Sequence, residues 1–183
     1  LVRMKGLHEN GLYSVGVRIS TALLLVLIAL RAAWPAFAFS IKDDNEAKRT
    51  YGFVLTYVLY ICCWLSLTVS LLAPWLVRLL TTPSFYSASE VVPLLVFAVT
   101  AFVAFNVMSI GIGRAKKTQF NWVVTGGAAL VNIGLNCVLI PPYGMVGAAI
   151  STLVAYVLMF LGMAVRAQQV FPVPYQWRRI ALV

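Results

Sequence analysis

The sequence predicts an all-α integral membrane protein, a polytopic bundle of five transmembrane helices. Three observations support this fold class. The 183 residues are 62% hydrophobic and only 10% charged, whereas soluble domains carry about a quarter charged residues. Five apolar runs reach the roughly 20 residues that a helix needs to cross a bilayer. Most of the polar residues gather in short connections between these runs.

In chain order, the runs predict spans at about 12–40, 52–80, 91–113, 119–140 and 145–165. The connections are KDDNEAKR (42–49), TTPSFYSASE (81–90), RAKKT (114–118) and PPYG (141–144). The first two runs exceed the minimal length, which indicates tilt or extension beyond the bilayer. We expect PPYG itself to form a tight external turn, with both prolines ending the fourth span.

The segment at 168–180 follows the fifth span and combines aromatic rings with two adjacent arginines. Such a segment suits the membrane interface, so we expect an interfacial tail there. The chain starts at Leu1 and stops as a new apolar stretch begins. We therefore expect a fragment of one larger transmembrane domain.

The basic residues predict the orientation of the spans. If the spans alternate, one side of the membrane receives Lys42, Lys48, Arg49, Arg114, Lys116, Lys117, Arg166, Arg178 and Arg179. The other side receives only Arg3, Lys5 and Arg78. Cytoplasmic loops carry the excess of cations, so the N-terminus is expected outside and the C-terminus in the cytoplasm. Topology thus largely accounts for the net charge of +9, and we expect no nucleic-acid partner.

Arg18 and Arg31 are the two charges within the first predicted span. The spacing between them corresponds to about 220° around an ideal helix, so they do not share a face. Pro35 removes the hydrogen bond to the carbonyl of Arg31, which predicts a kink and a free acceptor beside a fixed cation. Two interpretations of Arg31 remain open: it faces a polar cavity, or it reaches the cytoplasmic headgroups.

A polar and small-residue stripe marks the fourth span, and a weaker one marks the third. The first stripe consists of Asn121, Thr125, Ala129, Asn132 and Asn136, whose spacing keeps them on one helical face. The second consists of Asn106, Ser109 and Gly113. For Asn132 and Asn136, interhelical hydrogen bonding and the lining of a water-filled cavity are both open.

Other small or polar residues in the spans predict helix packing. Ser66 and Ser70 are expected to bond between helices, and the spacing of Gly147 and Ser151 lets helices approach closely. The three cysteines lie in apolar runs without metal-ligand spacing, so we expect free thiols that act as small apolar residues.

No span contains an acidic residue, and the single histidine, His8, lies in the N-terminal segment. General acid–base and nucleophilic catalysis need such groups in reach of one another. We therefore expect no enzyme, no metal site and no cofactor.

Five stretches carry a family resemblance: ENGLYSVGVRIS (9–20), RAAWPAFAFS (31–40), LAPWLVRLLTTPSF (72–85), LNCVLIPPYGMVGAAISTLVAY (135–156) and FPVPYQWRRI (171–180). Together and in this order, they resemble bacterial polysaccharide biosynthesis proteins. These are the lipid-linked oligosaccharide flippases of the multidrug/oligosaccharidyl-lipid/polysaccharide (MOP) exporter superfamily. The resemblance implies a two-bundle transporter, of which this chain would supply five later helices and lack the N-terminal bundle.

The resemblance also implies a function. Such flippases move undecaprenyl-pyrophosphate-linked oligosaccharide repeat units across the bacterial inner membrane by alternating access. The products are surface polysaccharides such as O-antigen and exopolysaccharide, so polymerase machinery and membrane lipids are expected partners. Their cavities are cationic, and Arg18 and Arg31 fall in stretches similar to the family's GLYSVGVR-like and RxAWPxF-like segments. Ala36 replaces a second proline that many relatives carry, which implies a milder kink.

The predicted cavity residues are thus Arg31, Arg18, Asn132, Asn136 and Asn106. Two alternatives of other kinds remain open. A multidrug or cation exporter of the same superfamily would need ion-coupling carboxylates. A multi-pass membrane enzyme of the polysaccharide pathway would need large external loops or a catalytic carboxylate. A structural membrane scaffold is the remaining interpretation.

Overall fold

The computed structural model describes residues 2–114, 119–170 and 172–173, and every regular element within them is helical. The elements are α1 (Val2–Ser20), η1 (Thr21–Leu23), α2 (Leu24–Ser40), α3 (Asp44–Leu80), η2 (Pro83–Glu90), α4 (Val92–Arg114) and α5 (Gln119–Val170). Four helical segments are long and apolar enough to cross a membrane: Gly6–Ser40, Asp44–Leu80, Val92–Arg114 and Asn121–Val170. The prediction of an all-helical chain with membrane-length helices is confirmed to that extent.

The first of these segments joins α1, η1 and α2. α2 stays helical through Pro35 to Ser40. The change in helix geometry lies earlier, at the 3₁₀ turn Thr21–Leu23. Proline fixes φ near −65°, which is a helical value, so Pro35 removes a hydrogen bond without ending the helix.

α3 begins earlier than the apolar pattern predicts, because most of the expected connection at 42–49 is helical. The carboxylate of Asp43 accepts a hydrogen bond from the backbone N–H of Glu46 at 2.9 Å. This N-cap satisfies a free donor, and the acidic first turn complements the positive end of the helix dipole. Capping therefore sets the start of α3 at Asp44, within a polar stretch.

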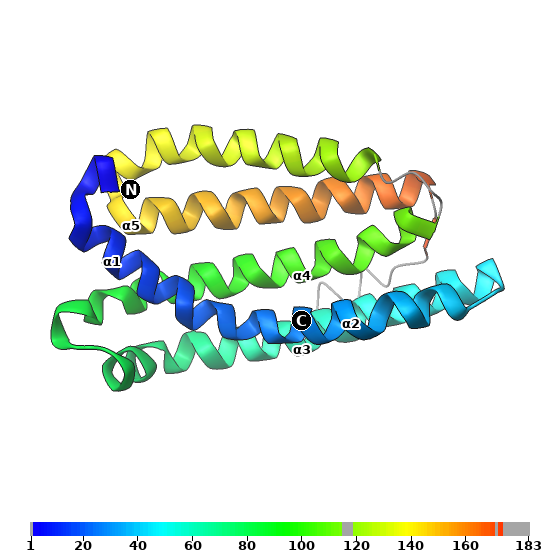
Figure 1. The fold of residues 1–183 in the computed structure, drawn as a ribbon, viewed down its shortest axis with the longest axis horizontal. Coiled ribbons are helices and arrows are strands. Elements are labelled where there is room, and N and C mark those ends of the chain that lie inside the picture. Colours follow the sequence, from blue (N-terminus) through cyan, green and yellow to red (C-terminus); the bar gives the residue numbers. More distant parts are fainter. Residues whose placement is uncertain (1, 115–118, 171, 174–183) are drawn as a thin grey trace.

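α5 is a hairpin of two antiparallel arms, 119–143 and 145–170, which reverses at Gly144 (Figure 1). Gly144 has φ 55° and ψ −127°, a conformation open to glycine at little steric cost. The helix continues through Pro141 and Pro142, so the prediction that these prolines end the fourth span was wrong. Their fixed φ is compatible with a last helical turn, and the glycine makes the reversal.

α4 lies between α3 and α5 (Figure 1) and is the most buried of the long helices. In the most apolar 18-residue stretch of α4, 67% of the residues are buried, against 17% in the most apolar stretch of α3. Two hydrophobic clusters share α4, one around Trp34 and Tyr51 and the other around Val77. We call the end of the assembly where α2 meets α3 the Arg114 end, and the end where α5 reverses the Gly144 end.

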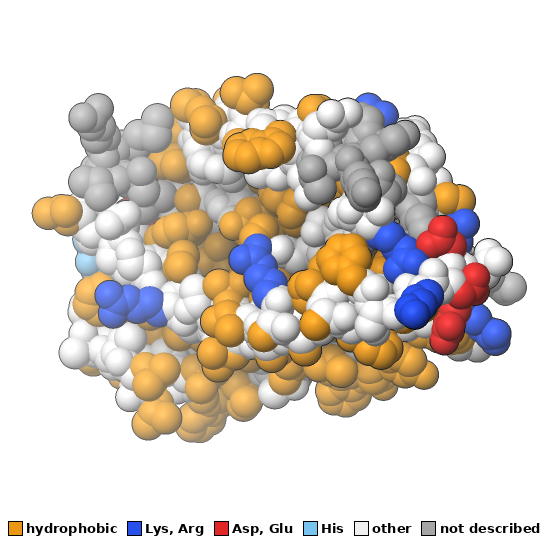
Figure 2. Space-filling view, turned by 45° about the vertical axis from the view of Figure 1, so that its right-hand side comes forward, with side chains coloured by type: hydrophobic (Ala, Val, Ile, Leu, Met, Phe, Trp, Pro, Cys, Tyr) orange, Lys and Arg blue, Asp and Glu red, His pale blue; other side chains and the backbone are white. Residues whose placement is uncertain are grey.

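The outer face of α3 is apolar. Its exposed large side chains include Tyr57, Tyr60, Trp64, Leu71, Trp75 and Leu79. Figure 2 shows hydrophobic side chains over much of one face, while the acidic side chains visible in this view gather at the end where α3 begins. Such an extended apolar surface is typical of contact with a membrane.

Several predictions fall on residues outside the described part of the chain. They concern the interfacial tail at 171 and 174–180, with Arg178 and Arg179, and the loop cations Lys116 and Lys117. The side chains of Arg3 and Lys5 are likewise not described.

Candidate functional site

Arg31 projects from α2 toward α4, where its guanidinium meets the side chain of Asn106. Its Nε and Nη2 atoms donate to Asn106 Oδ1 at 3.2 and 2.7 Å. Asn106 Nδ2 donates in turn to the backbone oxygen of Phe102 at 2.7 Å. These bonds orient the amide with its oxygen toward the guanidinium. α2 and α4 thereby hold the cation in one orientation.

A pocket of about 180 Å³ surrounds this pair, well above the roughly 10–15 Å³ that one water needs. We call it the Arg31 pocket; its lining is Leu30, Arg31, Trp34, Pro35, Asn106, Ser109 and Ile110. The Arg31 side chain is exposed, and the contacts to Asn106 use two of the five N–H donors of a guanidinium. The pocket thus presents a fixed cation with donors available to an anionic or hydrated group.

Trp34 adds a second donor to this region. Its side chain is 5% exposed, with the edge of one ring against the face of the other in its pair with Tyr51, at a centroid distance of 5.2 Å. The buried Nε1–H has no hydrogen-bond partner among the described residues. Leaving such a donor unpaired costs about 1–3 kcal/mol.

Arg18 does not contribute to the Arg31 pocket. It lines a separate cavity between α1 and α3, together with residues such as Val69 and Leu76. The two arginines thus line different cavities among the described residues, in agreement with their helical spacing. Their assignment to a substrate cavity stays a prediction.

Asn132 lines a third cavity, of about 420 Å³, between α1, α4 and the arms of α5. Other polar groups of its lining are Thr125, Tyr156, Tyr13 and Thr152. The hydroxyl oxygens of Tyr13 and Thr152 lie 3.2 Å apart. Asn136 Nδ2 donates to Asn132 Oδ1 at 2.9 Å within one arm of α5. This bond joins neighbouring turns of one helix rather than two helices, and it leaves Asn136 Oδ1 buried without a partner among the described residues.

Of the residues predicted to pack, Ser66 and Gly147 lie at close contacts between helices, whereas the hydroxyl of Ser70 donates to the backbone oxygen of Ser66 within α3. Ser66 of α3 is buried, and its hydroxyl lies 2.7 Å from that of Thr100 on α4. A Cβ built on Gly147 would overlap the backbone carbonyl of Leu139 on the other arm of α5, so only glycine permits this approach. Cys62, Cys63 and Cys137 are free thiols, as predicted.

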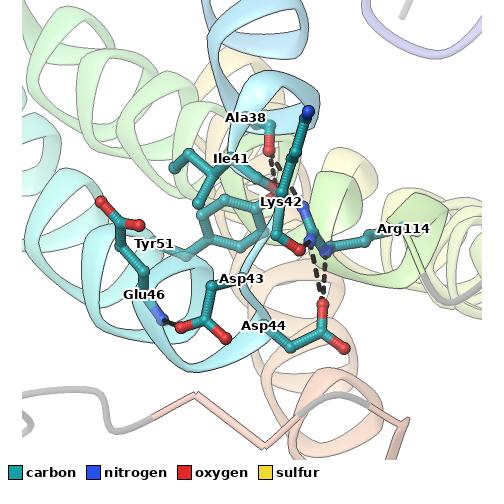
Figure 3. Close-up of polar contacts among 8 residues, drawn as sticks. All are labelled: Ala38, Ile41, Lys42, Asp43, Asp44, Glu46, Tyr51 and Arg114. Carbon is teal, nitrogen blue, oxygen red and sulfur yellow. Dashed lines mark hydrogen bonds and ion pairs between the residues drawn. The ribbon is translucent and has the colours of Figure 1, made fainter.

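Arg114 makes contacts that the sequence did not predict (Figure 3). Its guanidinium forms a salt bridge with Asp44, with Nη2 and Oδ1 2.9 Å apart. Nη1 donates to the carbonyl of Ile41 at 2.8 Å, and longer bonds reach the carbonyls of Ala38 and Lys42. Arg114 thus caps the C-terminus of α2 and ties α4 to the start of α3. From the sequence alone, Arg114 is only a basic residue at the end of an apolar run.

Glu9 ties the opposite end of the assembly. Its Oε2 accepts the backbone N–H of Met145 at 2.9 Å, which satisfies the first donor of the second arm of α5. A Cβ on Gly144 would lie 2.7 Å from this oxygen. The contact joins α1 to the α5 reversal, and only the chain's fold brings these distant segments together.

Among the described residues, no group of three histidines, cysteines, aspartates or glutamates gathers to hold a metal ion. No protein-family model, curated protein or solved structure matches this chain. The site geometry and the sequence pattern therefore carry the argument about function.

Proposed function

We propose that this chain is part of a flippase for undecaprenyl-pyrophosphate-linked oligosaccharide repeat units. It would move them across the bacterial inner membrane by alternating access, for surface polysaccharide biosynthesis. The observation that carries the proposal is the Arg31 pocket, a hydratable site with a fixed guanidinium on an apolar helix. The sequence resemblance suggests the substrate class, and the pocket chemistry suits the substrate's head group.

The physical reason concerns charge. A pyrophosphate that enters the apolar interior without a counter-ion pays a large desolvation cost. Arginine stays protonated and offers a planar fork of donors that matches phosphate oxygens. Asn106 holds that fork in place, so little side-chain entropy remains to be lost on binding. The polyprenyl chain can stay in lipid while the head group crosses beside Arg31.

Alternating access also requires contacts at each end of the transporter that form and break in turn. In this proposal the Arg114 contacts and the Glu9 contact have this role, and its support is that each joins separate helices through a few polar bonds. The count of cations favours the Arg114 end as the cytoplasmic side. In this proposal the protein transports without a cofactor and works beside a polysaccharide polymerase.

The test is genetic complementation with the complete gene product in a strain that lacks its native flippase. We expect Arg31→Ala to abolish surface polysaccharide, and Arg31→Lys to restore part of it, because lysine keeps the charge but not the fork. Arg49→Ala is the matched control, since Arg49 is an exposed arginine of α3 outside the pocket. Full display by the Arg31→Ala variant at equal protein level would refute the proposal.

A further inference from the structure

The cavity that contains Arg18 differs in character from the Arg31 pocket. It measures about 380 Å³, within the range of roughly 300–1,000 Å³ for small-molecule sites. Its apolar lining is Val15 and Ile19 of α1 with Val69, Leu76 and Leu80 of α3. Arg18 and Thr81 are the polar members of the lining. We call this space the Arg18 groove.

Arg18 has an exposed side chain, and its guanidinium has no ion pair or hydrogen bond among the described residues. Arg78, near the same end of α3, differs in this respect. Its guanidinium carbon lies 5.8 Å from the centre of the Tyr86 ring, within the range of a cation–π contact. The acidic Glu9 is bonded to Met145. Arg18 is thus a cation without an observed counter-charge, beside an apolar groove.

The groove lies near the end of a membrane-length helix. Leu80 is the last residue of α3 and Thr81 is its C-cap, so the groove reaches the level where the apolar run gives way to polar residues. Phospholipid headgroups occupy that level of a bilayer. A groove with apolar walls and an unpaired cation at this level is complementary to an acyl chain that carries a phosphate.

We infer that the Arg18 groove binds one anionic phospholipid of the surrounding bilayer, with its phosphate at Arg18 and an acyl chain between α1 and α3. The bound lipid fills space that these helices leave between them. Arg18 then has a different task from Arg31: it holds a resident lipid, whereas Arg31 faces the transported head group. This inference requires a membrane environment but not the proposed substrate.

The experiment is native mass spectrometry of the complete protein in detergent, titrated with phosphatidylglycerol or phosphatidylcholine. A basic residue near a membrane surface contributes about 1 kcal/mol toward anionic lipid, which corresponds to about fivefold in affinity. We expect phosphatidylglycerol to bind the wild type about fivefold more tightly than phosphatidylcholine. Arg18→Ala removes this preference, Arg18→Lys keeps most of it, and Arg78→Ala matches the wild type.

A second variant tests the groove itself. Ala22 lines it and is exposed, so Ala22→Phe fills the groove without removing a cation, and it should weaken the binding of both lipids. Equal phosphatidylglycerol affinity in the wild type and Arg18→Ala overturns the inference, as does an equal loss in Arg78→Ala. Binding of a polyprenyl phosphate in preference to phosphatidylglycerol would assign the groove to the carrier lipid and also overturn it. No transport is measured, so these outcomes are independent of the flippase proposal.

Discussion

Replacing Arg114 by alanine removes the contacts that join α4 to the α2–α3 connection. The ion pair with Asp44 is one of them, and the Asp44 side chain is 68% exposed. Exposed pairs contribute only about 0.2–1 kcal/mol to stability. The bonds to the carbonyls at the end of α2 differ, because the Arg114 side chain is only 15% exposed and the main acceptor is the carbonyl of Ile41, the C-cap residue, where the helix supplies no partner.

The magnitude follows from the geometry of these bonds. The bond to Ile41 is 2.8 Å long, whereas those to Lys42 and Ala38 measure 3.2 and 3.3 Å, at or beyond the usual limit for a good N–H···O bond. One good bond to a charged donor contributes about 1.5–3 kcal/mol. Together with the ion pair, Arg114→Ala should lower the free energy of unfolding by about 2–4 kcal/mol. Asp44→Asn leaves the bonds to the carbonyls intact; it weakens the ion pair and removes one negative charge from the first turn of α3, and each of these exposed contributions is no more than about 1 kcal/mol.

The assay is unfolding of the purified protein in mixed micelles by SDS titration, followed by circular dichroism. Arg49→Ala serves as the control because Arg49 is exposed and contributes no cap. Arg114→Lys should recover part of the loss, since a lysine can reach a carbonyl but lacks the fork. Equal losses for Arg114→Ala and Asp44→Asn would show that the ion pair, and not the cap, is the main contribution and would refute the reasoning.

Two further predictions concern α5. Gly147→Ala should destabilise the hairpin by about 1–3 kcal/mol in the same titration, because the new methyl group overlaps the Leu139 carbonyl. Gly134→Ala should instead be neutral or stabilising, since it has open space around it; an equal loss for both glycines would contradict the packing argument. Asn132→Cys, in a cysteine-free background, should react with a membrane-impermeant thiol reagent because it lines a cavity. Ser66→Cys, which is buried, should not react, and protection of both positions would favour packing for Asn132.

Local caps and turns account for the helix boundaries that the apolar pattern misplaced. Apolar runs predict the helices because each run is long enough to be read locally. The start of α3 was missed because a side-chain cap places it within polar residues. The fourth span was predicted to end at the prolines of PPYG, although the helix continues through them and the glycine of that turn, with positive φ, makes the reversal.

In the candidate site, too, local sequence pattern predicts some features, whereas contacts between distant segments are missed. Helical spacing alone predicts that Arg18 and Arg31 serve different faces, and the structure places them in different cavities. Asn106 was singled out as a polar residue in an apolar span, but its bond to Arg31 depends on how α2 packs on α4. The contacts of Arg114 and Glu9 also join segments far apart in the chain. Such pairings depend on how the helices pack in three dimensions, and the hydrophobic pattern of one sequence does not predict that packing.

The central claim is that Arg31 binds the anionic head group of the substrate. The most direct measurement is the equilibrium affinity of undecaprenyl pyrophosphate for the complete purified protein and for its Arg31→Ala and Arg31→Lys variants. A hydrogen bond to a charged group contributes about 1.5–3 kcal/mol, which corresponds to about tenfold to a hundredfold in affinity. We predict a loss of that size for alanine and a smaller loss for lysine. An Arg31→Ala variant that binds as tightly as the wild type would contradict the claim.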